Sequence, residues 1–164
     1  MWSFLGKKIA DFFVTLGLKK LVDKCKRTPS KEPTVEELKR KTHVLFVDDE
    51  DFSTRLKSIR DAGWSVNQIP DVTNFNCTEI ERANIIFMDY IGVGQALTPT
   101  DQGIGLLKEL KRRYPEKYLV FYSGYAGFIP GHEFHGIADA WIAKSSDPYV
   151  FIDQIEDAAK KIHG

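Results

Sequence analysis

His43 to Asp51 reads HVLFVDDED, an apolar run that ends in four consecutive acidic residues. Three later segments have the same form: IIFMD at residues 85–89, LVFYSG at 119–124 and WIAK at 141–144. Short apolar runs bounded by turn-forming or polar residues are typical of parallel β-strands buried on both faces. The carboxyl ends of such strands meet at one edge of the sheet, where ligands bind. The sequence therefore predicts one site built from the ends of four strands.

The side chains expected at this edge restrict its chemistry. Three carboxylates, from Asp48, Asp49 and Asp89, repel one another and favour a bound hard divalent cation, for which Mg²⁺ is expected. A carboxylate held beside a Lys and a Ser can act as a nucleophile toward a phosphoryl group. The Lys144 ammonium would stabilise charge on the transferring oxygens, and the Ser123 hydroxyl would donate a hydrogen bond to one of them.

These four segments, taken in order, resemble the receiver domain of two-component response regulators over residues 43 to about 162. The resemblance implies an α/β fold with a doubly wound, five-stranded parallel sheet in the flavodoxin-like order 2-1-3-4-5. The matching positions are the acidic pair Asp48 and Asp49, the phosphoacceptor Asp89, Ser123 with the small Gly124 after it, Lys144, and Trp141 three residues before that Lys.

The resemblance also implies a reaction and a metal site. Asp89 would accept a phosphoryl group from a sensor histidine kinase or a phosphotransfer protein. Mg²⁺ would be held by Asp48 or Asp49, by Asp89 and by the backbone carbonyl of Ile91, with Asp49 the expected direct ligand.

Three side chains around the acceptor would then respond to the phosphoryl group. Lys144 would pair first with Asp89 and afterwards with the phosphoryl oxygens, while Ser123 would turn inward to the phosphate. The space left by Ser123 would let Trp141 reorient, and this conformational change would signal to a downstream protein partner. Simple packing in the core is an equally open interpretation of Trp141.

The sequence departs from the family pattern in three places. Loop 89–103 is longer than usual and lacks the Met-Pro pair, which indicates a functional or mobile connection. Lys144 precedes Ser145 rather than the usual cis-Pro, so either a trans bond or a strained one is expected. The bulky Ile91 and Tyr125 occupy the two variable positions flanking the site, which predicts slow loss of phosphate.

Two other functional classes fit parts of the pattern. A phosphorylation-independent pseudo-receiver would use the same fold as a protein-interaction or membrane-docking module. The altered loop and the missing Lys-Pro pair favour it, and the complete set of acidic, hydroxyl and Lys residues argues against it. A metal-dependent phosphatase would need a residue that positions the attacking water, and none is evident. We therefore expect no enzyme activity beyond self-phosphorylation and autodephosphorylation.

The first 27 residues form a basic, amphipathic segment. Residues 1–31 contain eight Lys or Arg and two Asp, a net charge of about +6 in a chain whose formal net charge is zero. Residues 28–42 are expected to be a linker and a short helix before the receiver-like region 43–164. Helical spacing places large apolar side chains on one face of the extension: Trp2, Leu5, Ile9, Phe12, Phe13 and Leu16.

Three roles stay open for this helical extension (1–27). It fits an in-plane membrane anchor whose lysines face anionic headgroups, or a docking or dimerising helix that binds a protein groove. It also fits packing on the receiver-like region of its own chain or of its twin in a homodimer. No uncharged run approaches the ~20 residues of a membrane span, and no secretory signal is evident. We expect a cytoplasmic protein, with the inner membrane face as a peripheral site, and no nucleic-acid partner because no DNA-binding segment follows.

Local signals place the helices. Thr34 and Glu37 have the spacing of a capping box, and Asn76 is a candidate cap for a short helix. Asp147-Pro148 has the residue types that begin a helix, which would be the last one. Further helices are expected over residues 52–62, 76–82, 104–114 and 133–137.

Overall fold

The computed structural model describes residues 32–124 and 136–164. The chain divides into two compact units, Met1–Glu32 and Pro33–Gly164, and the second holds nearly all of the described residues. Several predictions therefore lie wholly or mostly outside the described residues: the amphipathic extension (1–27) with its apolar face from Trp2 to Leu16, the first part of the linker, Tyr125 and the brief helix at 133–137.

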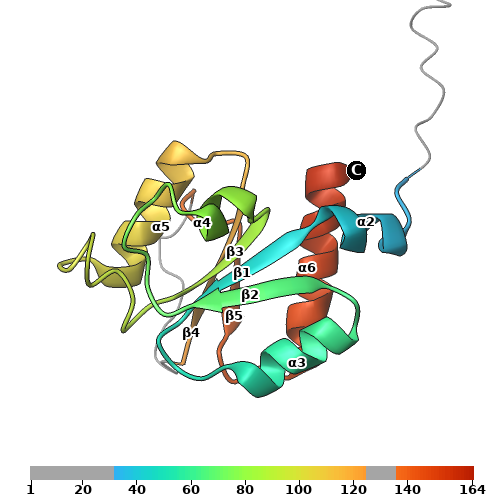
Figure 1. Cartoon of the computed structure of the whole chain (residues 1–164), viewed down its shortest axis with the longest axis horizontal. Helices are drawn as coiled ribbons and strands as arrows, with labels where there is room; N and C mark the ends of the chain where they lie inside the picture. The colour runs from blue at the N-terminus through green and yellow to red at the C-terminus, as the bar shows by residue number, and fades with distance from the viewer. Residues whose placement is uncertain (1–31, 125–135) are drawn as a thin grey trace, which may run out of the picture. The chain divides into compact units, whose positions relative to one another are not determined.

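A five-stranded parallel sheet forms the centre of the described unit, as predicted (Figure 1). Its order is β2-β1-β3-β4-β5, and every neighbouring pair runs parallel. The order reverses between β1 and β3, so the two strands that carry the acidic residues flank the topological switch point. The strands are β1 (His43–Val47), β2 (Ser65–Ile69), β3 (Ile85–Asp89), β4 (Tyr118–Ser123) and β5 (Ala140–Ala143).

Helices cover both faces of the sheet because side chains alternate along each strand. Phe46 points into a core formed with α3 and α6, while its neighbour Leu45 points into a second core formed with α4 and α5. Figure 1 shows these two helix pairs on opposite sides of the strands. The helices are α2 (Val35–Lys41), α3 (Ser53–Asp61), α4 (Thr78–Arg82), α5 (Gln102–Arg113) and α6 (Pro148–His163).

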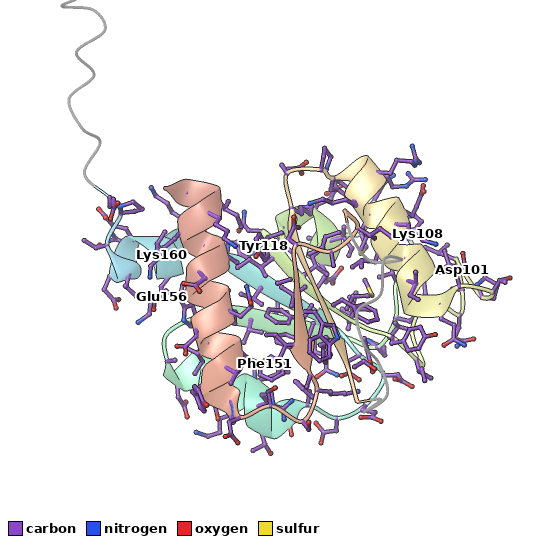
Figure 2. All side chains as sticks on the ribbon, turned by 180° about the vertical axis from the view of Figure 1, so that it is seen from behind. Asp101, Lys108, Tyr118, Phe151, Glu156 and Lys160 are labelled. Atoms are coloured by element: carbon purple, nitrogen blue, oxygen red, sulfur yellow. The ribbon has the colours of Figure 1, made fainter. Side chains whose placement is uncertain are left out.

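The core beneath α3 and α6 contains a cluster of aromatic rings. The rings of Phe46 and Phe87 stack with centroids 4.4 Å apart, and Phe52, Tyr122 and Phe151 pack around them. Such ring contacts stabilise a core beyond the area they bury. Figure 2 labels Phe151 on α6, where it is fully buried. This packing fixes Tyr122, which lies one residue before the end of β4.

Two predicted helix starts are confirmed. Thr34 and Glu37 form the full capping box at the start of α2, which packs against α6. Asp147 is the N-cap residue of α6 and Pro148 its first residue, although the Asp147 side chain makes no capping hydrogen bond. None of the helices in the described part of the chain is long and apolar enough to cross a membrane.

Two other predicted starts are wrong. Helix α4 begins at Thr78 with Cys77 as its N-cap, because Asn76 Oδ1, the atom a cap would use, accepts instead from the Tyr114 hydroxyl at 3.3 Å. Helix α5 begins at Gln102, two residues before the predicted start. The reason is the contact between this helix and the end of β3, described below.

Candidate functional site

The ends of four strands meet at one edge of the sheet. Asp48 and Asp49 follow β1, Asp89 ends β3, and one carboxylate oxygen from each lies within 4.8 Å of the others. Ser123 ends β4 and is buried, and Lys144 follows β5. Together with Glu50, Ile91, Gly92 and Gly124, the side chains of Asp49, Asp89, Ser123 and Lys144 line a cleft of about 430 Å³.

Asp48 is completely buried, and both oxygens of its carboxylate accept hydrogen bonds. Its Oδ1 accepts from the Glu50 backbone N–H at 2.9 Å and from Lys144 Nζ at 3.1 Å. Its Oδ2 accepts from the Tyr122 hydroxyl at 2.6 Å and lies 3.0 Å from Lys144 Nζ. A carboxylate offers about four lone-pair positions, and these three donors occupy most of them. Asp48 therefore serves as the internal counter-ion of Lys144.

The Lys144 ammonium joins the acidic groups. It lies 2.7 Å from Asp89 Oδ2 and 2.9 Å from Glu50 Oε2, in addition to its contacts with Asp48. Burial alone would lower the pKa of Lys144, but the hydrogen bonds to Asp89, Glu50 and Asp48 outweigh it and raise that pKa above its usual value. Lys144 is therefore a permanent positive charge in the cleft.

The backbone around Lys144 is held by a second cation. The Arg55 guanidinium donates to the Lys144 carbonyl at 2.5 Å and stacks between the rings of Phe52 and Phe151. No cis peptide bond occurs among the described residues, so the Lys144–Ser145 bond is trans, one of the two expected outcomes. The Arg55 contact fixes this loop where receivers of the usual pattern have a proline.

Asp89 is buried, and both oxygens of its carboxylate accept hydrogen bonds. Its Oδ1 accepts from the Tyr90 backbone N–H at 2.7 Å, and its Oδ2 accepts from Lys144. Burial raises the pKa of Asp89, and the hydrogen bonds from Lys144 and Tyr90 oppose that rise without cancelling it. The carboxylate is thus partly desolvated, which favours reaction with an incoming electrophile.

Asp49 differs from the other two acids because it is exposed. No group among the described residues donates a hydrogen bond to its carboxylate. The backbone of Gly92, at φ +90°, lies against this carboxylate so closely that a Cβ there would overlap it. Asp49 therefore has the most lone pairs to offer. Asp48 and Asp89 each place one oxygen within 4.8 Å of it, and hard carboxylate oxygens at this spacing fit Mg²⁺.

The loop after Asp89 is a closed structure. The Gly103 N–H donates to the Tyr90 carbonyl at 3.2 Å, which brings the two ends of the loop together. A Cβ on Gly103 would overlap the Asp89 carbonyl oxygen, so α5 begins in direct backbone contact with β3. This contact explains why α5 starts at Gln102. The long connection is thus a compact loop of the Ω type, with Val93 fully buried.

The remaining predicted residues lie in different places. Gly124 lines the cleft beside Lys144, and Ile91 lies at its rim with 58% of its surface exposed. Trp141 is 38% exposed, whereas its neighbour Ile142 is buried in the core, so the core-packing interpretation of Trp141 is wrong. Tyr125 lies outside the described residues. Tyr122 was not predicted as a site residue, because a Tyr inside an apolar strand has no distinguishing local signal.

The described fold is shared with many solved structures. A CheY-like response regulator receiver domain protein from Methanospirillum hungatei JF-1 aligns with a TM-score of 0.54 and 19% identity, over 74% of this chain and 95% of that one. This is the receiver fold. A response regulator of Burkholderia pseudomallei with a phosphorylated aspartic acid and a calcium ion aligns with a TM-score of 0.50 and 18% identity, over 74% and 70% of the two chains.

Longer proteins contain the same receiver fold. NtrX of Brucella abortus aligns with a TM-score of 0.60 and 24% identity, over 74% of this chain but only 28% of NtrX. No protein-family model matches the sequence, and no curated protein is significantly similar to it. The receiver fold is therefore established by the structure rather than by sequence similarity.

Proposed function

We propose that this chain is a phospho-accepting response regulator in which Asp89 takes a phosphoryl group from a sensor histidine kinase or a phosphotransfer protein. The observation that supports this most is the position of Lys144, whose ammonium bridges Asp48 and Asp89 beside the exposed Asp49. A fixed cation beside a desolvated carboxylate suits phosphoryl transfer, which depends on positioning and charge stabilisation. The phosphorylated aspartic acid of the Burkholderia pseudomallei regulator, which has the same fold, is consistent with this chemistry.

The proposed step needs no proton from Asp89. Its carboxylate attacks as an anion, a P–O bond forms, and the P–N bond of a phosphorylated imidazole breaks with its electron pair staying on the imidazole nitrogen. Lys144 keeps its proton and faces the transferring oxygens, since its pKa is raised. The Ser123 hydroxyl, at the end of β4, donates a hydrogen bond to one of these oxygens in the phosphorylated protein. Gly124 leaves the approach to the cleft open.

Asp49 and Asp89 would hold Mg²⁺, with the Ile91 carbonyl as a further protein ligand. When bound, the cation supplies additional stabilisation of charge on the phosphoryl oxygens. Asp48 contributes indirectly, because it keeps Lys144 in place. The predicted pair of Asp48 and Asp49 thus divides into an internal counter-ion and a ligand.

Intact-mass measurement after incubation with acetyl phosphate or phosphoramidate tests the proposal. Wild-type protein with Mg²⁺ should gain about 80 Da, the mass of one phosphoryl group. The gain should disappear in Asp89→Asn and in the presence of EDTA. Asp153→Asn, which changes an exposed acid on α6, serves as the matched control and should be labelled like the wild type. Absence of the adduct in wild type would support the pseudo-receiver, which signals without phosphorylation.

The remaining expectations follow from this proposal. The phosphorylated state would signal by conformational change around Ser123 and Trp141 to a downstream protein partner. The only turnover we expect is loss of the protein's own phosphoryl group. Attachment of residues 1–27 to a membrane, a partner or a second copy stays a prediction. Sedimentation with vesicles containing anionic lipid tests attachment to a membrane. Size-exclusion chromatography tests association with a second copy.

A further inference from the structure

Asp71 lies outside every motif of the receiver pattern but at the same edge of the sheet as the cleft. It follows β2 by two residues. Its Oδ1 accepts from the Gly94 backbone N–H at 2.5 Å and from the Val72 N–H at 2.7 Å, and its Oδ2 accepts from the Ala96 N–H at 3.4 Å. A single carboxylate therefore satisfies two backbone donors of the loop after Asp89, more than twenty positions away along the chain.

The anchored residues are next to the wall of the cleft. Ile91 and Gly92 line the cleft, and Gly92 lies against the Asp49 carboxylate. Val93 is buried in the core beneath α5, and Gly94 donates to Asp71. Gly94 is therefore only two residues from Gly92, with the buried Val93 between them, so the contact with Asp71 constrains the segment that faces Asp49.

The rest of the loop supports the same arrangement. Thr98 donates its N–H to the Gly94 carbonyl at 2.8 Å and its hydroxyl to the Gln102 carbonyl at 2.9 Å. Gly94 has φ +81° and packs against the Gln102 backbone, where a Cβ would lie 2.6 Å from the carbonyl oxygen. The loop is thus closed on itself and joined to the β2–α4 connection through Asp71.

We propose that Asp71 is a positioning residue that holds residues 91–94 against the acidic side chains and thereby sets the geometry of the cation site. This inference rests on the proposed function, because it assumes that Asp49 and Asp89 bind Mg²⁺. Residues that orient the ligands of a metal from outside its coordination sphere commonly change its affinity by one to two powers of ten when lost.

Three variants test the role of Asp71. Asp71→Ala removes both acceptor oxygens. Asp71→Asn removes the charge but keeps one carbonyl oxygen, which can still accept from Gly94. Asp101→Asn removes an equal charge from the loop that Asp71 anchors, at an exposed side chain that makes no capping hydrogen bond, at the N-terminal end of α5 (Figure 2). Comparison of the three variants distinguishes the effect of losing the hydrogen bonds that anchor the loop from the effect of losing one negative charge.

The Mg²⁺ dissociation constant, from isothermal titration calorimetry, is the first measurement. Asp71→Ala should bind Mg²⁺ roughly tenfold more weakly than wild type, Asp71→Asn should lie between them, and Asp101→Asn should match wild type. Amide hydrogen exchange without Mg²⁺ is the second. The amides of Gly94 and Ala96 should exchange faster in Asp71→Ala, and that of Ala96 also in Asp71→Asn, while those of β1 and β3 stay protected.

The outcomes separate this inference from the proposed function. No Mg²⁺ binding by wild type would overturn the cation site itself. Binding by wild type and equally by both Asp71 variants would overturn only the role of Asp71. Equal losses in Asp71→Ala, Asp71→Asn and Asp101→Asn would show that charge is the cause and would also overturn it. If Asp71→Ala does not fold, Asp71→Asn decides, because faster exchange at Ala96 with unchanged affinity contradicts the proposal.

Discussion

The Tyr122 hydroxyl donates a 2.6 Å hydrogen bond to Oδ2 of Asp48, and both side chains are completely buried. Burial, together with the charge of Asp48, raises the pKa of Tyr122 far above its usual value, so the hydroxyl keeps its proton and remains a donor. The bond joins the aromatic core to the acidic edge of the sheet. It also holds the Asp48 carboxylate in the interior, where it pairs with Lys144. Asp49, the next residue, stays exposed.

Tyr122→Phe removes this hydroxyl and keeps the ring in the core. The buried Asp48 oxygen then loses one of its partners, which should lower the free energy of unfolding by about 2 kcal/mol. Urea denaturation at pH 7 measures the change. Tyr149→Phe is the control, because Tyr149 is 63% exposed, and it should change stability by less than about 0.5 kcal/mol. Equal stability of the two variants would mean that the hydrogen bond adds nothing.

Lys144→Met removes the cation shared by three acids. Because Asp48 and Asp89 are buried, the loss leaves two carboxylates uncompensated and should cost about 3 kcal/mol of stability in EDTA. Mg²⁺ should recover part of the loss, since it returns positive charge to the cleft. Lys57→Met breaks an exposed ion pair with Asp61 and should cost at most about 0.5 kcal/mol. A small effect of Lys144→Met without metal would contradict the assignment of Lys144 as the central charge.

Asp89→Asn should change how stability depends on pH. Since the pKa of Asp89 is raised above its usual 3.8 in the folded protein, the unfolded chain ionises first as pH increases. The charged form therefore opposes folding: its cost is absent at pH values below 3.8, grows through the raised pKa and persists at neutral pH.

The measurement is the difference in unfolding free energy between Asp89→Asn and wild type, in EDTA. The unfolding free energy of the variant should exceed that of wild type by an amount that grows from pH 4 to pH 7. Asp153→Asn, at an exposed position of α6, should give a flat difference over this interval. A difference that shrinks as pH rises would mean that the ion pair with Lys144 outweighs burial.

Gly103→Ala tests the contact between α5 and β3. The new Cβ would overlap the Asp89 carbonyl oxygen, so the helix must shift, at a cost of about 2 kcal/mol. Gly124→Ala is a suitable contrast, because its Cβ would meet only Lys144 side-chain atoms at 3.8 Å or more, an ordinary contact. Thermal unfolding compares the two variants. Equal melting temperatures would contradict the close approach seen at Gly103.

The sequence allowed prediction of the features that depend on nearby residues. Apolar runs ending in Asp48, Asp89, Ser123 and Lys144 predicted the strands and the edge where they meet. This information is local, because a buried strand is a short apolar run and the polar residue after it marks its end. The start of α5 was mispredicted, since Gly103 disfavours a helix by intrinsic propensity. The close approach of two backbone segments, which only the fold reveals, requires this Gly.

Two further residues could not be found in the same way. Tyr122 lies within an apolar strand, and its role depends on Asp48, which is 74 positions away along the chain. Asp71 is of a residue type common in turns, and two of its three partners, Gly94 and Ala96, lie 23 and 25 positions away along the chain. Contacts between distant loops leave no periodic pattern in a single sequence.

The closed base of the loop after Asp89 makes its outer part available for engineering. The hydrogen bond between Tyr90 and Gly103 fixes both ends, and Pro99 and Thr100 are exposed between them. The Thr98 carbonyl accepts from the Asp101 and Gln102 N–H groups across this turn, so the backbone should stay continuous and a label should be attached to a side chain. A fluorophore on Thr100→Cys, with Cys25 and Cys77 replaced, would be tethered within one loop of the cleft. The protein could then serve as the scaffold of a sensor that reports when its cleft is occupied.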